Sequence, residues 1–221
     1  MIKKLIIFGI GDVAELASFY FSKFTDYKVE AFSIDEEYIK DTSQGNTPII
    51  SFKEVCTLYS PEDVEFFIAL GYAKVNELRK QKFNLLKKMG YRLASFVSPS
   101  ATFLSENKIG ENVFILENNT IQPFVKIGNN VTMWSGNHIG HHTQILDHCF
   151  ITSQVVISGR VIIEEQCFLG VNSTIRDRLS IGKKSVIGAG SLILSNVMCN
   201  SVFRGYETKP SSISSSRLSK I

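Results

Sequence analysis

Two folds in succession are predicted for this chain: an α/β domain with a parallel sheet, followed by a parallel β-helix. Before residue 97, apolar strand-like runs alternate with segments of helical spacing, and after it an apolar residue recurs at every sixth position. The 221 residues, 44% of them hydrophobic, suffice for two domains that each bury a core. We therefore expect domains at 1–96 and 97–198 and a C-terminal tail at 199–221.

The α/β prediction rests on the order of the first segments. A strand at 3–10, a helix at 12–24 and a second strand at 28–35 form a βαβ unit. This alternation is typical of a parallel, Rossmann-like sheet with helices on both faces. The remaining expected elements are a strand at 47–51, a short helix at 52–59, a buried strand at 64–70, a long amphipathic helix at 73–90 and a final strand at 92–97.

The β-helix prediction rests on the hexads after residue 97. The residue four positions after each apolar one is mostly small or β-branched, as at Val113, Thr143 and Cys149. Each hexad would form one short strand and a turn, and stacked coils bury apolar positions that a single coil leaves exposed. The repeated apolar residues are Val97, Phe103, Ile109, Ile115, Ile121, Ile127, Met133, Ile139, Ile145, Ile151, Ile157, Ile163, Leu169, Ile175, Ile181, Ile187 and Ile193.

The four cysteines show no CxxC spacing and no disulfide framework, which is typical of a reducing compartment. Cys149 and Cys167 are separated by three hexads, so they are expected to stack as reduced fillers of the core. We therefore expect a cytoplasmic protein without disulfides.

The charge pattern favours neither a nucleic-acid nor a membrane partner. The formal net charge is only +3, and basic runs such as RKQK, from Arg79, fit a solvated helix face. No apolar stretch has the length needed to span a bilayer, and the first residues lack a secretory pattern.

The domain order, the hexads and the stretch HIGHHTQILDHCFITSQVVISG followed by CFLGVNSTIRD resemble the sugar acyltransferases of bacterial surface-glycan pathways. The best-known members N-acetylate nucleotide-linked 4-amino sugars in bacillosamine and perosamine synthesis, and sialic acid O-acetyltransferases are similar. The resemblance implies a left-handed β-helix, a homotrimer, acetyl-CoA as the donor and active sites between adjacent subunits.

The resemblance also implies that His141 is the general base. It matches the histidine of the family's HEC or HDC motif and precedes Gly159 by eighteen residues. An imidazole of near-neutral pKa suits removal of a proton from an attacking amine. His142 stands where the family carries a carboxylate, so the base is either less activated or oriented by another acid, for which Asp147 is the candidate. The alternative is that His141 is only an exposed turn residue.

The other histidines of this region have weaker assignments. Asn137 and His138 could line the sugar pocket or be turn residues of the β-helix, and His148 is expected to be a surface turn residue. A zinc site is disfavoured, because the hexads turn His138, His141 and His142 in differing directions and no cysteine or carboxylate completes a tetrahedral set. We expect no metal.

The cofactor residues carry over only in part. Phe150 aligns with a histidine that contacts the cofactor in the bacillosamine enzyme, so that contact is expected to be lost. The small residues Gly159, Gly170 and Ala189 would line the path of CoA without obstructing it. The tail departs from the family's usual ending, and Arg204 or Lys209 could meet a CoA phosphate or be a surface charge.

The front domain would hold the nucleotide-sugar. FGIGDVA follows a strand and opens a helix, but Ala14 replaces the third glycine of GxGxxG, so a nicotinamide dinucleotide is not expected. Glu36 could equally be a helix-cap or loop residue. The positions that the family uses correspond to Gly11, Asp12, Asp35, Glu36, Gly71 and Lys74.

The expected function is acetyl transfer from acetyl-CoA to the amine, at C4, of an amino-deoxysugar linked to dTDP, UDP or GDP. The nearest alternative is O-acetylation of a sugar hydroxyl, since the base and donor would be the same. From another class, the chain could be a non-catalytic nucleotide-sugar-binding protein with a structural β-helix.

Overall fold

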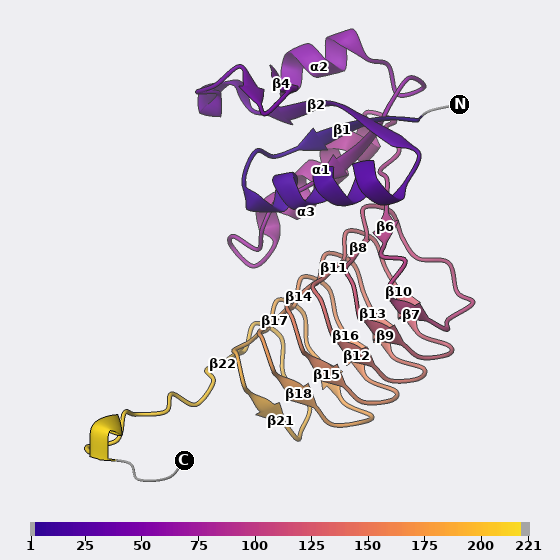
Figure 1. Cartoon of the computed structure of the whole chain (residues 1–221). Helices are drawn as coiled ribbons and strands as arrows, with labels where there is room; N and C mark the ends of the chain where they lie inside the picture. The colour runs from indigo at the N-terminus through magenta and orange to yellow at the C-terminus, as the bar shows by residue number, and fades with distance from the viewer. Residues whose placement is uncertain (1–2, 218–221) are drawn as a thin grey trace.

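The computed structural model describes residues 3–217. An α/β domain lies on one end of a β-helix, and the C-terminal segment leaves its other end (Figure 1). The α/β sheet has the strand order β3-β4-β2-β1-β5, and its neighbours are parallel except for the β3–β4 pair. Its strands are β1 (Lys3–Phe8), β2 (Tyr27–Ile34), β3 (Ser43–Gln44), β4 (Thr47–Ser51) and β5 (Glu65–Ile68).

Helices cover both faces of this sheet, as the alternating pattern predicts. Leu5 and Ile7 of β1 pack in one core with α1 (Asp12–Phe24), because alternate side chains of a strand point to opposite faces. Ile6 and Phe8 pack in a second core with α2 (Phe52–Leu58) and α3 (Glu77–Lys88).

Two expectations for the front domain are wrong. The segment 92–97 adds no full strand to the sheet: Leu93 makes one isolated bridge to Phe66, and Phe96–Val97 is β6, which pairs with β8 of the β-helix. The long helix begins at Glu77 and not at residue 73, because the residues before it are left-handed, with φ of +53° at Val75 and +63° at Asn76. The Asn76 side chain donates to the carbonyl oxygen of Cys167, 3.2 Å away, which anchors this turn to the β-helix.

The β-helix stacks two-residue strands into three parallel sheets, and the second residue of nearly every strand is a buried apolar hexad residue, as predicted. The stacked strands continue past residue 198, because β22 pairs with β20. The first sheet holds β6 (Phe96–Val97), β8 (Phe114–Ile115), β11 (Thr132–Met133), β14 (Phe150–Ile151), β17 (Phe168–Leu169), β20 (Val186–Ile187) and β22 (Val202–Phe203). The second sheet holds β7 (Thr102–Phe103), β9 (Thr120–Ile121), β12 (His138–Ile139), β15 (Val156–Ile157), β18 (Thr174–Ile175) and β21 (Leu192–Ile193). The third sheet holds β10 (Lys126–Ile127), β13 (Gln144–Ile145), β16 (Ile162–Ile163) and β19 (Ser180–Ile181).

Cys149 and Cys167 lie in the core one coil apart, both buried and both free, as expected. Burial raises the pKa of the Cys149 thiol, so it stays protonated and packs as a small apolar residue. No described helix is long and apolar enough to cross a membrane.

Helix α3 joins the two domains by lying along the corner between the third and first sheets. Arg79 is fully buried there, so the expectation of a solvated helix face is wrong for this residue. Its guanidinium donates to the carbonyl oxygens of Asn130 (2.7 Å), His148 (3.3 Å) and Cys149 (3.1 Å). The prediction that His148 is a surface turn residue is therefore wrong: it is 5% exposed, and its ring packs against Phe83 of α3.

Helix α1 forms the other part of this joint. The Tyr20 hydroxyl donates to Oε2 of Glu117 at 2.7 Å, at the corner between the first and second sheets. Tyr20 also packs on Phe96 and Phe114 of the first sheet. The front domain thus contacts the first sheet and the two corners beside it, and the described contacts leave out the corner between the second and third sheets.

Candidate active site at the His141 corner

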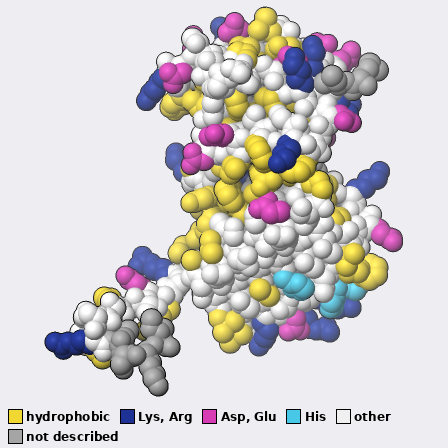
Figure 2. Space-filling view, in the orientation of Figure 1, with side chains coloured by type: hydrophobic (Ala, Val, Ile, Leu, Met, Phe, Trp, Pro, Cys, Tyr) yellow, Lys and Arg dark blue, Asp and Glu magenta, His cyan; other side chains and the backbone are white. Residues whose placement is uncertain are grey.

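His141 and His142 lie at that third corner, in the turn between β12 and β13. Gly140 begins the turn, where a methyl group would lie 2.5 Å from the backbone nitrogen of Gly159 in the next coil. The turn is fixed to its neighbours, because the His142 N–H donates to the Pro123 carbonyl at 3.2 Å. His142 has φ of +60°, and both imidazoles are exposed. Figure 2 shows histidine side chains on the β-helix surface away from the front domain.

The His141 ring has two close neighbours. Its Nδ1 lies 3.0 Å from Nδ1 of His142, at hydrogen-bond distance. On its other side the ring lies against Gly159, where a methyl group would be 2.7 Å from both Nε2 and Cε1 of His141. Only glycine leaves room for the imidazole in this position. The spacing of eighteen residues thus brings His141 and Gly159 together at one corner.

The surroundings of His142 are cationic. Its ring centroid lies 4.7 Å from that of Phe124, and an open hollow beside it is lined by Lys126 and Arg160. Desolvation of its ring by the neighbouring groups, then the charges of Arg160 and His141, lower the pKa of His142 below its ordinary value. Phe124, Lys126 and Arg160 were not among the residues expected here, because nothing in the sequence links them to the histidines except their positions in adjacent coils.

Asp147 does not orient His141. It lies one corner farther along the chain, where its Oδ1 accepts from the backbone N–H of Asn129 at 2.6 Å. The position opposite Nδ1 of His141 is taken by His142, so in the described part of the chain an imidazole occupies the place where a carboxylate was sought.

Asn137 and His138 differ in their placement. Asn137 is 1% exposed, and its side chain bonds within the β-helix, to Asn119 Oδ1 (2.9 Å) and to the Val155 N–H (2.8 Å). Of the two interpretations left open for Asn137, the geometry favours the structural one. His138 is a half-buried residue of β12 and lies between Thr120 and Val156 on the outer face of the second sheet.

The expected cofactor residues lie at different places. Gly159 shares the corner of His141, whereas Gly170 and Ala189 lie at the corner between the first and second sheets. Phe150 is 1% exposed and packs against Tyr72 of the front domain, so it lies at the joint between the two domains. Arg204 is exposed and follows β22.

The front-domain residues lie at the carboxyl ends of the parallel strands, where ligands of open α/β sheets bind. Gly11 precedes α1 and has open space where a Cβ would lie, and Gly71 follows β5 and has open space as well. Asp35 follows β2 and pairs with Lys82 of α3, with 2.6 Å between Oδ1 and Nζ. Lys82 was missed, because only the folded chain brings α3 against this edge.

The remaining expected positions of the front domain are at the same edge. Asp12 is the first residue of α1, and Glu36 begins a short 3-10 helix (Glu36–Tyr38) after β2. Lys74 lies in the left-handed turn before α3, with φ of +51°. All three side chains are exposed.

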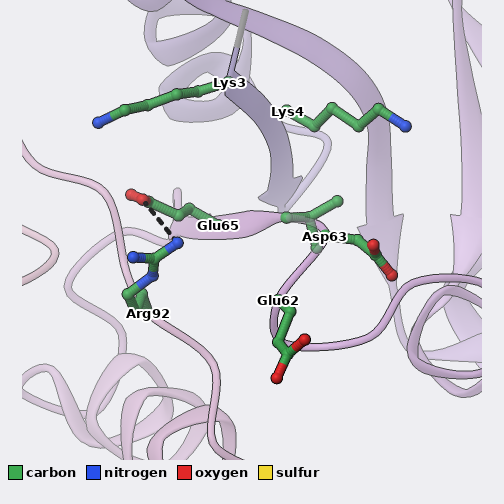
Figure 3. Close-up of a pocket in the computed structure, with 7 residues that line it drawn as sticks. Lys3, Lys4, Glu62, Asp63, Glu65 and Arg92 are labelled. Atoms are coloured by element: carbon green, nitrogen blue, oxygen red, sulfur yellow. Dashed lines mark ion pairs between the residues drawn. The ribbon is translucent and has the colours of Figure 1, made fainter. Parts of the chain in front are cut away.

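A second hollow lies at the opposite edge, near the starts of β1 and β5 (Figure 3). Lys3 and Lys4 point apart in Figure 3, and Arg92 lies 3.6 Å from Glu65. The charges that line this hollow are of both signs and partly paired, and the hollow lies away from the carboxyl ends of the strands. We therefore do not assign a ligand to it. Within residues 3–217 no group of three or more His, Cys, Asp or Glu side chains is arranged to hold a metal ion.

Several proteins share this architecture. Residues 93–202 match the family model described as the GMPPB C-terminal domain. No curated protein matches this chain in sequence.

Solved structures are similar over nearly the whole chain. The acetyltransferase domain of PglB from Neisseria gonorrhoeae FA1090 has a TM-score of 0.82 at 20% identity, covering 94% of this chain and 99% of that one. PerB from Caulobacter crescentus, in complex with CoA and GDP-perosamine, has a TM-score of 0.79 at 20% identity, covering 91% and 94%. WeeI from Acinetobacter baumannii AYE has a TM-score of 0.80 at 18% identity, covering 92% and 97%. The resemblance found in the sequence is thus confirmed at the level of the fold.

Proposed function

We propose that this protein transfers the acetyl group of acetyl-CoA to the amine, at C4, of a nucleotide-linked amino-deoxysugar, with His141 as the general base. The observation that carries the proposal is the exposed His141 ring, which is held against Gly159 and whose Nε2 has no hydrogen-bond partner within residues 3–217. A neutral imidazole nitrogen open to solvent can take a proton from a substrate. Two of the similar structures support this reaction, since one is an acetyltransferase domain and another holds CoA and GDP-perosamine.

The reaction needs one proton to be removed from the substrate. The amine nitrogen attacks the thioester carbonyl, a C–N bond forms, and the C–S bond of the thioester breaks. Nε2 of His141 takes the proton from the amine nitrogen, and the departing CoA thiolate takes up a proton in its turn. A hydroxyl is harder to activate and normally requires a base strengthened by a carboxylate. Since His142 is the partner here, we propose N-acetylation rather than O-acetylation.

The nucleotide would bind at the carboxyl edge of the front sheet, which we propose to be a Rossmann-like domain. Open backbone amides near Gly11 at the start of α1 suit a diphosphate, because a helix N-terminus attracts anions. Asp35, held by Lys82, is suited to accept hydrogen bonds from a base or a ribose. The sequence positions do not select among dTDP, UDP and GDP.

Two copies of the chain would be needed to complete the site. The front domain contacts the first sheet and its two corners, whereas His141 lies at the third corner. Gly170 and Ala189 lie at another corner as well, so the second subunit would also supply part of the path of CoA. We propose a cytoplasmic homotrimer of left-handed β-helices in which neighbouring subunits share each site, acting in surface-glycan synthesis. Exposed apolar side chains on the far coils, such as Leu192 (62%) and Met198 (79%), support subunit packing.

The experiment is His141→Asn, assayed by CoA release with matched nucleotide-linked 4-amino and 4-hydroxyl sugars. We expect kcat with the amino sugar to fall at least ~10²-fold, with the affinity for the nucleotide and the unfolding temperature unchanged as internal controls. Near wild-type turnover would refute His141 as the base, and a lack of turnover by the wild-type protein would favour the binding-protein alternative. A higher kcat/KM for the hydroxyl sugar would replace N- with O-acetylation.

Light scattering tests the trimer, which a fully active monomer would exclude.

A further inference from the structure

The contact between the two histidines requires one shared proton. The Nδ1 atoms of His141 and His142 are 3.0 Å apart, and a hydrogen bond at this distance needs one nitrogen to donate and the other to accept. If His142 donates, neutral His141 carries its own proton on Nε2, and that nitrogen is then no base. If His141 donates, its Nε2 bears the free electron pair. Only the second arrangement makes Nε2 of His141 able to accept a proton.

The fixed position of His142 suits it to be the acceptor. Its backbone N–H is bonded to the Pro123 carbonyl, and its ring lies beside Phe124, with 4.7 Å between centroids and an angle of 41° between the ring planes. These two contacts place the imidazole so that its Nδ1 is directed at His141.

The charges around His142 favour its neutral form. The charged groups that line its hollow are Lys126 and Arg160, and among residues 3–217 the other titratable group beside it is His141. No carboxylate lines this hollow within the described residues. A protonated imidazole would face two cations, and it could not accept a hydrogen bond because both its nitrogens would be donors. The lowered pKa of His142 agrees with this.

We propose that His142 is a positioning residue: its neutral Nδ1 accepts the Nδ1–H of His141, which fixes the tautomer with a free Nε2 and stabilises the imidazolium formed when His141 takes the amine proton. The inference rests on the proposed function. The proton moves from the substrate nitrogen to Nε2 of His141, and the Nδ1–H remains on His141 and strengthens its bond to His142 as positive charge develops. No proton passes to His142, so this neutral partner differs from a carboxylate in adding no charge to the site.

The test compares three variants of the full-length protein. His142→Phe keeps a planar ring beside Phe124 but removes the acceptor, and we expect kcat to fall about 10- to 100-fold, the value of a hydrogen bond to a charged group. His142→Asn suits the left-handed backbone and offers Oδ1 as an acceptor, so it should restore kcat to within about fivefold of wild type. His142→Asp should keep activity and raise the pKa of the acid limb of the kcat profile, because a carboxylate favours the protonated form of His141.

Nitrogen NMR of 15N-histidine-labelled wild-type protein near neutral pH gives a readout that a merely structural role would not move. We expect the signals of His141 to be those of the Nδ1–H tautomer, and in His142→Phe this preference should be lost. An Nε2–H tautomer of His141 in the wild-type protein would overturn the proposal, as would a His142→Phe variant with wild-type kcat and pH profile. If His141→Asn were also fully active, the proposed function itself would fail; an inactive His141→Asn beside a fully active His142→Phe would overturn only the role of His142.

Discussion

Replacing Gly159 by alanine should disable the base without unfolding the protein. The new methyl group would lie 2.7 Å from Nε2 and Cε1 of His141, whereas ordinary contacts begin at 3.4 Å, so the imidazole must move by about 0.7 Å or more. The ring is exposed and can rotate away, which would break its hydrogen bond to His142. A displacement of about 1 Å in a reacting group costs about 10²-fold in rate, and we expect a loss of that size in kcat.

The stability should change little, because Gly159 does not have a left-handed φ and the group that moves is an exposed side chain. Gly→Ala at such a compatible position contributes about 0.4–1 kcal/mol by restricting the unfolded chain, so the unfolding temperature should stay the same or rise slightly. The assay is CoA release with saturating amino sugar at varied acetyl-CoA.

A double-mutant cycle supplies the control. In a His141→Ala background the methyl group has room, so Gly159→Ala should cause no further loss of kcat. A fall in kcat of similar size in both backgrounds would refute the clash with His141. A raised KM for acetyl-CoA with unchanged kcat would show instead that residue 159 borders only the donor, and wild-type kinetics would refute the geometry altogether.

Three further predictions concern the joint, the pH dependence and metal. Arg79→Met should lower the free energy of unfolding, measured by urea denaturation, by about 2–5 kcal/mol, because it leaves buried carbonyl oxygens without a donor. The control is Lys87→Met, which removes only the half-exposed ion pair with Glu111 and should cost less than about 1 kcal/mol. Equal losses in the two variants would contradict the role of Arg79. Burial lowers the pKa of His148 to about 4, below its ordinary 6.5, so the unfolded chain binds the proton first as the pH falls and stability should drop between about pH 6.5 and 4. From pH 7 to 5 the loss should be about 1–2 kcal/mol after allowance for solvent screening, and a His148→Gln variant with the same pH dependence would contradict it. Acetyl transfer should persist in EDTA, whereas an activity lost to EDTA and restored by zinc would show a metal site.

The β-helix could be predicted almost strand by strand because its contacts repeat. Every sixth residue meets the same environment, so the stacking of Ile121 on Ile139 can be inferred from their spacing in the sequence. The start of α3 lacked such a signal. Helical spacing runs through residues 73–76, but Asn76 is anchored to Cys167, a residue far along the chain, and this long-range bond determines where the helix begins.

The candidate site divides in the same way. His141 and Gly159 could be paired because they are one coil apart, and counting in eighteens would also have separated Gly170 and Ala189 from them. The burial of His148 could not be predicted, because it depends on where α3 docks. The partner of His141 was sought as an acid, since carboxylates are the usual partners of catalytic histidines, and the adjacent imidazole was not considered as an acceptor.

Because α3 docks along one corner of the β-helix, its length is matched to a fixed number of coils. Twelve helical residues span about 18 Å, and four steps between stacked strands span about 19 Å. The helix meets successive coils in order, from Lys87 with Glu111 at one end to Glu77 with Lys184 at the other. An additional coil inserted between these two contacts would move the contact residues of the β-helix away from their partners on α3. A coil added beyond residue 187 would lengthen the β-helix and leave the joint intact. Growth in the length of this molecule is therefore confined to the end that carries the C-terminal segment.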